Sequence, residues 1–343
     1  MAGSLNGAYR PSDRRVSFAE SEVPTMPAVV RARGRMLALL DDGADDGSAV
    51  QLPRTQAGSQ PQHLLLTLLG DYFLDSSEYI PSASLVSLLE EFGITSAGSR
   101  AALSRLSRRG LLASSKSGRN TYYRLTERAA ALLREGAQHI LGFGAAERRW
   151  SGSWTIVAFS VPEDQRQSRP VLRTRLRWLG FAPLYDGLWI SPHPPTDDIN
   201  AVLDELRIKA STVFVGEIRD RVGGNPPLSA WDLDELRSVY TDFIEEFAEL
   251  RLRVSNGDVG AAEGLVARTT IMDRWRNMPN LDPELPGELL AKDWPRDAAR
   301  ALFVDVYDGL GALAEMRVRQ ILAEFSVPLS SIATHHTTEL VTH

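Results

Sequence analysis

The chain has 343 residues, 43% of them hydrophobic and 24% charged, with a net charge of −6 and no cysteine. This length predicts two or three domains, and the lack of cysteine excludes disulfides, thiolate metal sites, iron–sulfur clusters and cysteine nucleophiles. No apolar run approaches the roughly 18 residues that span a bilayer, and the N-terminus has no secretory signal pattern. We therefore expect a cytoplasmic protein with no membrane partner.

The net charge taken alone argues against a nucleic-acid partner, but the charge is unevenly distributed. Residues 97–149 carry eleven basic and three acidic residues, whereas residues 151–343 carry twenty basic and twenty-nine acidic residues. A concentrated basic segment in an acidic chain indicates contact with nucleic acid. A solvated surface would give the same charge, so this interpretation depends on the elements that carry it.

Residues 1–60 have no sustained hydrophobic period and are rich in Gly, Ser, Pro, Ala and Asp. Such a segment buries too little apolar surface to offset the entropy lost on ordering. We therefore expect a disordered N-terminal extension over 1–60, with at most a short transient helix at 29–40.

Residues 61–145 begin with three predicted helices. Leucines at helical spacing after Pro61 predict the first helix, and residues 82–92 predict the second. The third helix covers residues 96–109 and stops at Gly110, a residue that readily adopts the left-handed cap conformation.

A short β-hairpin is predicted next, from residues 111–113 and 121–125 with a polar turn at 114–120. Thr126 then caps a further helix. Three helices, a hairpin and a helix in this order predict a winged helix-turn-helix domain.

The third helix has the residue types of a recognition helix. Ser104, Arg105 and Arg108 fall on the face opposite the leucines, and Arg100 and Arg109 flank it. Small residues let the helix backbone enter the major groove, and arginines bind guanine edges and phosphates. A solvated arginine face on a helical packing unit is the alternative reading. The predicted DNA contacts are Ser99, Arg100, Ser104, Arg105, Arg108, Arg109, Lys116, Arg119 and Tyr122.

Residues 150–225 follow a β-α-β-β-α-β order, which is the pattern of a ferredoxin-like domain. Asp186-Gly187 is a strong signal for the central hairpin turn. The predicted elements are a strand at 154–161, a helix at 166–179, strands at 181–185 and 188–191, a helix at 197–208 and a strand at 212–218.

An arginine stripe runs along the first helix of this region, at Arg166, Arg169, Arg173 and Arg177. These side chains could bind the phosphates of DNA or of a ligand. A solvated helix face explains the same pattern, so both readings stay open.

The rest of the chain is predicted to be helical over 230–328, with helices at 233–247, 261–278 and 296–325. Residues 329–343 are expected to form a polar tail. His335 and His336 are interpreted as part of that tail rather than as a pair of metal ligands. The predicted fold class is therefore α+β, with an all-α C-terminal domain.

Four stretches of this sequence resemble the PaaX family of phenylacetic-acid degradation repressors. They are SRAALSRLSRRGLL at 99–112, GRNTYYRLT at 118–126, SWTIVAFSVPEDQRQSRPVLRTRLRWLGFAPLYDGLWISP at 153–192 and LDPELPGELLAKDWPRDAARALF at 281–303. They match the DNA-binding, central and C-terminal parts of the family in order, so the resemblance covers about residues 61–325. The extension over 1–60 departs from the family pattern.

The resemblance implies a GntR-like winged-helix repressor that acts as a homodimer on a palindromic operator in double-stranded DNA. It also implies release by an aryl-acyl-CoA effector, such as phenylacetyl-CoA or another acyl-CoA, in control of aromatic-acid catabolism. It assigns no effector residues, and the arginine stripe stays a candidate for the effector site on its residue types alone. No cofactor, metal site or catalytic residue is expected.

Two alternatives remain. The first is a metal-dependent nuclease on the ferredoxin-like domain, because this domain resembles the small CRISPR adaptation nucleases. That activity needs a carboxylate at the end of the first strand, where this chain has Ser160 and no acid before Glu163. The second is a DNA-binding regulator without a small-molecule effector.

Overall fold

The structure is a computed structural model, and it describes residues 61–218 and 226–341. The expectation for residues 1–60 lies outside this part of the chain. The described part combines helices with two antiparallel sheets, so the α+β prediction is confirmed. None of the described helices combines the length and the hydrophobicity that a membrane span requires.

Residues 61–142 pack four helices against a small sheet, and we call this region the head. Its elements are α2 (Pro61–Tyr72), β1 (Ile80–Pro81), α3 (Ser82–Glu90), α4 (Ser96–Arg108), β2 (Leu112–Ser117), β3 (Asn120–Leu125) and α5 (Glu127–Gly142). The strand order is β1-β3-β2, with both pairs antiparallel. Leucines from α2, α3 and α4 fill the core, so the spacing that predicts these helices also sets their inward faces.

Local residue chemistry sets both ends of α4. The Thr95 side chain accepts a hydrogen bond from the Gly98 amide at 3.2 Å, which satisfies one of the free donors of the first turn. At the other end Gly110 has a φ of +70°, the left-handed conformation that terminates helices. The prediction of a stop at Gly110 is therefore confirmed.

The hairpin is longer than the sequence pattern indicates. The prediction of a polar turn over 114–120 is wrong, because β2 and β3 pair as far as Ser117 and Asn120. Only Gly118 and Arg119 remain in the turn. Residues 114–117 are all exposed, so this part of β2 lacks the apolar alternation by which a strand is recognised in sequence.

The central region has the predicted order of strands and helices. Its elements are β4 (Trp154–Phe159), α6 (Ser168–Trp178), β5 (Ala182–Tyr185), β6 (Leu188–Ser191), α7 (Asp197–Glu205) and β7 (Ser211–Gly216). The strands form one antiparallel sheet in the order β5-β6-β4-β7. Leu172 and Leu176 of α6 and Ile199 of α7 pack with Val157 and Trp189 of the sheet, so both helices contribute to one core.

The third region is helical, and we call it the body. Its helices are α8 (Leu233–Asn256), α9 (Ala261–Trp275), α10 (Met278–Leu281), α11 (Arg296–Gly309) and α12 (Gly311–Phe325). The prediction of one helix over 296–325 is wrong, because the helix is interrupted at Leu310, which lies between two glycines. Both glycines lie in tight contacts: a Cβ at Gly309 would approach Val254 to 2.8 Å, and one at Gly311 would approach His335 to 2.4 Å.

The prediction of a polar tail over 329–343 is also wrong for residues 329–341. Short 3-10 helices cover Val327–Ile332 and Thr338–Val341, and the intervening residues pack against the head and body. Ala333 is fully buried, and Thr338 is buried as well. The low apolar content of residues 329–341 predicts a solvated tail, but backbone amides and short polar side chains supply the contacts of this segment instead. We call residues 333–338 the strap.

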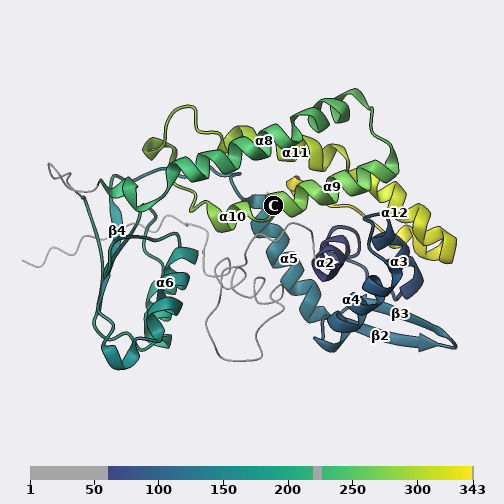
Figure 1. Cartoon of the computed structure of the whole chain (residues 1–343), viewed down its shortest axis with the longest axis horizontal. Helices are drawn as coiled ribbons and strands as arrows, with labels where there is room; N and C mark the ends of the chain where they lie inside the picture. Colours follow the sequence, from purple (N-terminus) through teal and green to yellow (C-terminus); the bar gives the residue numbers. More distant parts are fainter. Residues whose placement is uncertain (1–60, 219–225, 342–343) are drawn as a thin grey trace, which may run out of the picture.

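Figure 1 shows how the three regions are arranged. The sheet that contains β4 lies with α6 at one end of the molecule, and the β2–β3 hairpin projects at the other end. The body helices α8, α9 and α11 run along one side between them. This arrangement leaves α4 and the hairpin near the free edge of the molecule.

Candidate nucleic-acid interface

The predicted basic face of α4 lies at the surface of the head. Arg100, Ser104 and Arg108 are exposed, and Arg105 and Arg109 are half-buried. The opposite face is buried in the head core and consists of Ala102, Leu103 and Leu106. The helix therefore directs five of the predicted contact residues away from the core.

Ser99 has to be removed from the predicted contacts. Its side chain is fully buried and donates a hydrogen bond to the Thr95 carbonyl at 3.1 Å. Ser99 lies on the same helix face as Leu103 and Leu106, so it packs toward the core and supports the first turn of α4.

The hairpin adds a second set of predicted contacts. Lys116 and Arg119 are exposed at its end, and Tyr122 is half-buried. Tyr122 pairs with Ser115 on β2 and with Pro81 on β1, whereas Lys116 pairs with Thr121. Because neighbouring residues of a strand point to opposite faces, Tyr122 and Lys116 lie on different faces of the hairpin.

Most of these cations have no acidic partner. Within residues 61–218 and 226–341, no carboxylate pairs with Arg100, Arg105, Arg108, Lys116 or Arg119. In the same head, Arg134 pairs with Asp75 at 3.1 Å, and Arg124 lies over the ring of Tyr79 at 5.2 Å. Unpaired cations keep their charge and donors available for phosphate oxygens.

The arginine stripe of α6 differs in this respect. Arg166 and Arg169 lie near Glu163, at 3.5 and 3.8 Å, and Arg169 also donates to the Val161 carbonyl. Arg173 pairs with Asp186, and Arg177 lies over the Trp189 ring at 5.5 Å. A phosphate would have to compete with a carboxylate for three of the four arginines, so the stripe is a weaker anion surface than α4.

A buried polar cluster lies between head and body, centred on Arg268 of α9, and none of its residues is among the predicted site residues. Arg268 is fully buried and donates to Tyr72 at 3.2 Å, to the Tyr307 carbonyl at 3.0 Å and to the His336 carbonyl at 2.6 Å. Asp71 lies 3.6 Å from its guanidinium and accepts a hydrogen bond from the Tyr307 hydroxyl. We call these five residues the junction cluster.

Burial dominates the titration of the junction cluster. It raises the pKa of Asp71, although the charge of Arg268 opposes the shift. It also raises the pKa of Tyr72 to about 12, again against the effect of Arg268. The charged groups of the cluster are therefore stable in this buried position only while Arg268 and its partners remain in contact.

A second polar cluster lies where the body meets the segment that leads to the central region. Asp282 is buried, accepts a hydrogen bond from Tyr240 at 2.5 Å and pairs with Arg296 at 2.7 Å. Glu284 pairs with Arg148 at 2.6 Å. Burial acts to raise the pKa of Glu284, but Arg148, the Gly144 amide and Arg296 together more than compensate, so the net shift is downward.

The head, central region and body together define a three-part α+β protein that presents a basic helix and a basic hairpin at its surface. Three family models match these parts: "PaaX-like protein" at residues 60–129, "PaaX protein central Cas2-like domain" at 147–227 and "PaaX-like protein C-terminal domain" at 231–320. The chain belongs to the PaaX family.

One curated relative is the transcriptional repressor PaaX of Escherichia coli strain K12, which is 27% identical over 263 residues, covering 73% of this chain and 80% of the relative. The fold is also similar to that of the uncharacterized protein Rv0674 from Mycobacterium tuberculosis. That structure matches with a TM-score of 0.50 and 22% identity, over 77% of this chain and 98% of the other.

Proposed function

We propose that this protein is a DNA-binding transcriptional repressor that acts in the cytoplasm, and that its head is a winged helix-turn-helix domain. The observation that carries the proposal is the set of cations on α4 and the hairpin that have no acidic partner among the described residues. Membership of a family with a curated repressor supports it. In this proposal α4 enters the major groove, and the hairpin contacts the neighbouring backbone.

We further propose that two copies act together on a palindromic operator. The strand order β5-β6-β4-β7 supports a ferredoxin-like assignment for the central region. In the proposed dimer, this compact domain would lie between the head of each copy and the partner copy. Two heads would then read half-sites one helical turn apart, about 34 Å. A symmetric dimer matches such a site because each copy presents the same face to its half-site.

For the effector, we propose an aryl-acyl-CoA such as phenylacetyl-CoA, so that the regulated genes would serve aromatic-acid catabolism. The stripe at Arg166, Arg169, Arg173 and Arg177 is the proposed site for the CoA phosphates. Its arginines already have carboxylate, carbonyl or ring partners, so binding there would exchange one set of contacts for another. The effector must bind the DNA-competent and released states unequally.

The described residues offer no metal site for the nuclease alternative. No group of three or more His, Asp or Glu side chains among residues 61–218 and 226–341 is arranged to hold a metal ion. The segment after β4 offers Ser160, and the first acid, Glu163, is engaged by Arg166 and Arg169. The regulator without a small-molecule effector remains the second candidate.

The proposal is tested by selecting bound duplexes from a randomised DNA library with the full-length protein at physiological salt. We expect enrichment of a palindrome, and an Arg105→Ala/Arg108→Ala variant should bind it at least tenfold more weakly. The matched control is Arg166→Ala/Arg169→Ala, which should bind as the wild type does. Failure to enrich any sequence would refute specific DNA binding, and a palindrome that no acyl-CoA releases would favour the effector-free regulator.

A further inference from the structure

The strap lies beyond the last family model, which ends at residue 320, and yet it contacts both the head and the body. Its residues meet α2 of the head and α9, α11 and α12 of the body. This small segment therefore joins elements that are far apart in sequence.

The contact with the head includes a backbone hydrogen bond and a buried side chain. The Thr334 amide donates to the Tyr72 carbonyl at the end of α2, at 3.1 Å. Ala333, next to it, is fully buried in the core that α2 shares with α12. The strap thus reaches the core of the head and also binds the last turn of its first helix.

The contacts with the body are directional and partly charged. Arg268 donates to the His336 carbonyl at 2.6 Å, so the strap completes the junction cluster. The Thr338 amide and hydroxyl bind the two carboxylate oxygens of Asp308, at 2.9 and 2.6 Å. Hydrogen bonds to charged groups are stronger than neutral ones and fix geometry as well as contact.

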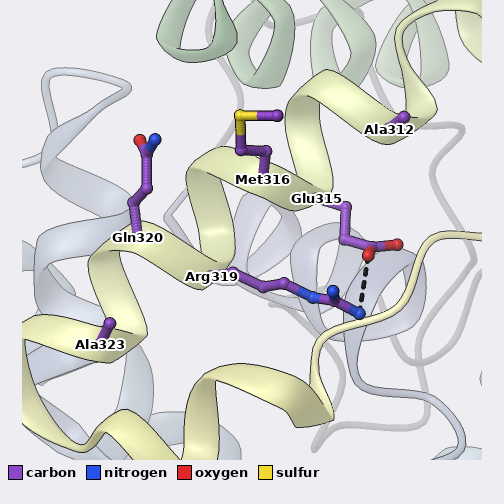
Figure 2. Close-up of a pocket in the computed structure, with 6 residues that line it drawn as sticks. All are labelled: Ala312, Glu315, Met316, Arg319, Gln320 and Ala323. Atoms are coloured by element: carbon purple, nitrogen blue, oxygen red, sulfur yellow. Dashed lines mark ion pairs between the residues drawn. The ribbon is translucent and has the colours of Figure 1, made fainter.

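On α12 the strap is held by an ion pair. Figure 2 shows Glu315 and Arg319 paired on the helix surface, among the residues that line a shallow pocket there. Glu315 accepts hydrogen bonds from the amide and the ring of His335, and Arg319 donates to the Ala333 carbonyl at 3.0 Å. Each of these two side chains therefore binds its partner and the strap at once.

We propose that the strap and Arg268 position the head on the body, so that the placement of the two DNA-reading heads depends on residues 333–338. This role in DNA binding rests on the proposed function. The hydrophobic driving force between head and body is non-directional, and the Arg317–Glu91 ion pair at 2.7 Å also crosses this joint. The strap adds hydrogen bonds of defined direction to both sides of the same joint.

Gly311 offers a way to displace the strap without touching Arg268. A Cβ at this position would lie 2.4 Å from the His335 ring, so Gly311→Ala forces the ring to move. Alanine is otherwise the better helix former, which keeps α12 intact. The matched control is Gly70→Ala on α2, where a Cβ would meet Leu133 at an ordinary 3.9 Å. A second strap variant ends the chain after Ile332.

The first measurement is the distance between head and body. Because the chain has no cysteine, spin labels can be placed at Ser115→Cys in the hairpin and Leu252→Cys on α8, both at exposed positions. We expect the distribution of distances to broaden in Gly311→Ala and in the shortened chain, and to stay narrow in Gly70→Ala. An unchanged distribution in both strap variants would overturn the proposal.

The second measurement compares a selected palindrome with a single half-site. Loss of positioning should weaken binding to the palindrome by about tenfold and leave half-site binding unchanged, because only simultaneous engagement needs a defined geometry. Equal loss at both sites would show damage to the head and would contradict the proposal. If the wild-type protein selects no duplex while the strap variants still broaden, the proposed function fails and the positioning role stands.

Discussion

Replacement of Arg268 with methionine should destabilise the protein far more than loss of an ordinary ion pair. Arg268 is fully buried, makes hydrogen bonds to the head, the body and the strap, and lies 3.7 Å from the centre of the Tyr307 ring. Methionine is unbranched and shorter, and it can keep the apolar contacts of the aliphatic stem. It removes the three hydrogen bonds and the cation opposite the buried carboxylate of Asp71.

Removal of one member of a buried ion pair costs about 3–5 kcal/mol, because the charge of the other member is left uncompensated. Asp71 limits this cost by taking up a proton, since burial already raises its pKa and Arg268 opposes that rise. When the pKa of a carboxyl group is raised in the native state, the protein becomes less stable as the pH rises above the pKa of that group in the unfolded chain. The free energy of unfolding that Arg268→Met loses relative to the wild type should therefore be larger at pH 8 than at pH 5.5.

The assay is urea unfolding at both pH values, followed by circular dichroism and tryptophan fluorescence. The matched control is Arg274→Met on the same helix, because Arg274 is exposed and pairs with Glu246 at 2.7 Å. An exposed pair contributes at most about 1 kcal/mol. Equal losses for the two variants, or a deficit of Arg268→Met that does not grow with pH, would refute this reasoning.

Three further changes have defined outcomes. Thr126→Ala removes the N-cap of α5 and should cost about 1 kcal/mol in urea unfolding, whereas no loss would contradict the capping role. Gly187→Ala places a Cβ 2.6 Å from the Phe159 carbonyl oxygen, so a thermal melt should show a loss of about 1–3 kcal/mol. Burial lowers the pKa of His193 and His336 from 6.5, so the unfolded chain binds more protons below that pH and stability should fall there. A His193→Gln/His336→Gln variant should lose less stability than the wild type between pH 7 and 5.5, and equal loss would point to other groups.

The elements that follow a single hydrophobic period could be predicted from sequence. The leucines of α2 and α4 recur at helical spacing, and the strands of the central region are apolar and end at clear turn signals. The basic face of α4 also follows from residue order alone, because the buried leucines fix the direction of Arg105 and Arg108. Helical spacing also places Ser99 on the inward face, which its burial confirms, and only its inclusion among the DNA contacts is wrong, because its hydroxyl is satisfied by the backbone.

The junction cluster and the strap depend on contacts between distant parts of the chain. Arg268 shares a helix face with Leu265, Met272 and Trp275, all of them buried. An arginine on an apolar face is the one local signal that a buried partner exists. Nothing local identifies Asp71 as that partner, because the two residues are brought together only by the packing of head and body. The order in the strap comes in the same way from its partners on four helices.

The central claim is that the head binds DNA through cations that have no acidic partner in the rest of the described chain. The most direct test is the salt dependence of duplex binding by the wild type and by Arg105→Ala/Arg108→Ala. Each lost phosphate contact should reduce the slope of log K against log salt concentration by about 1, so we predict a slope shallower by about 2 per head in the double variant. An unchanged slope, or an equal reduction in Arg166→Ala/Arg169→Ala, would contradict the claim.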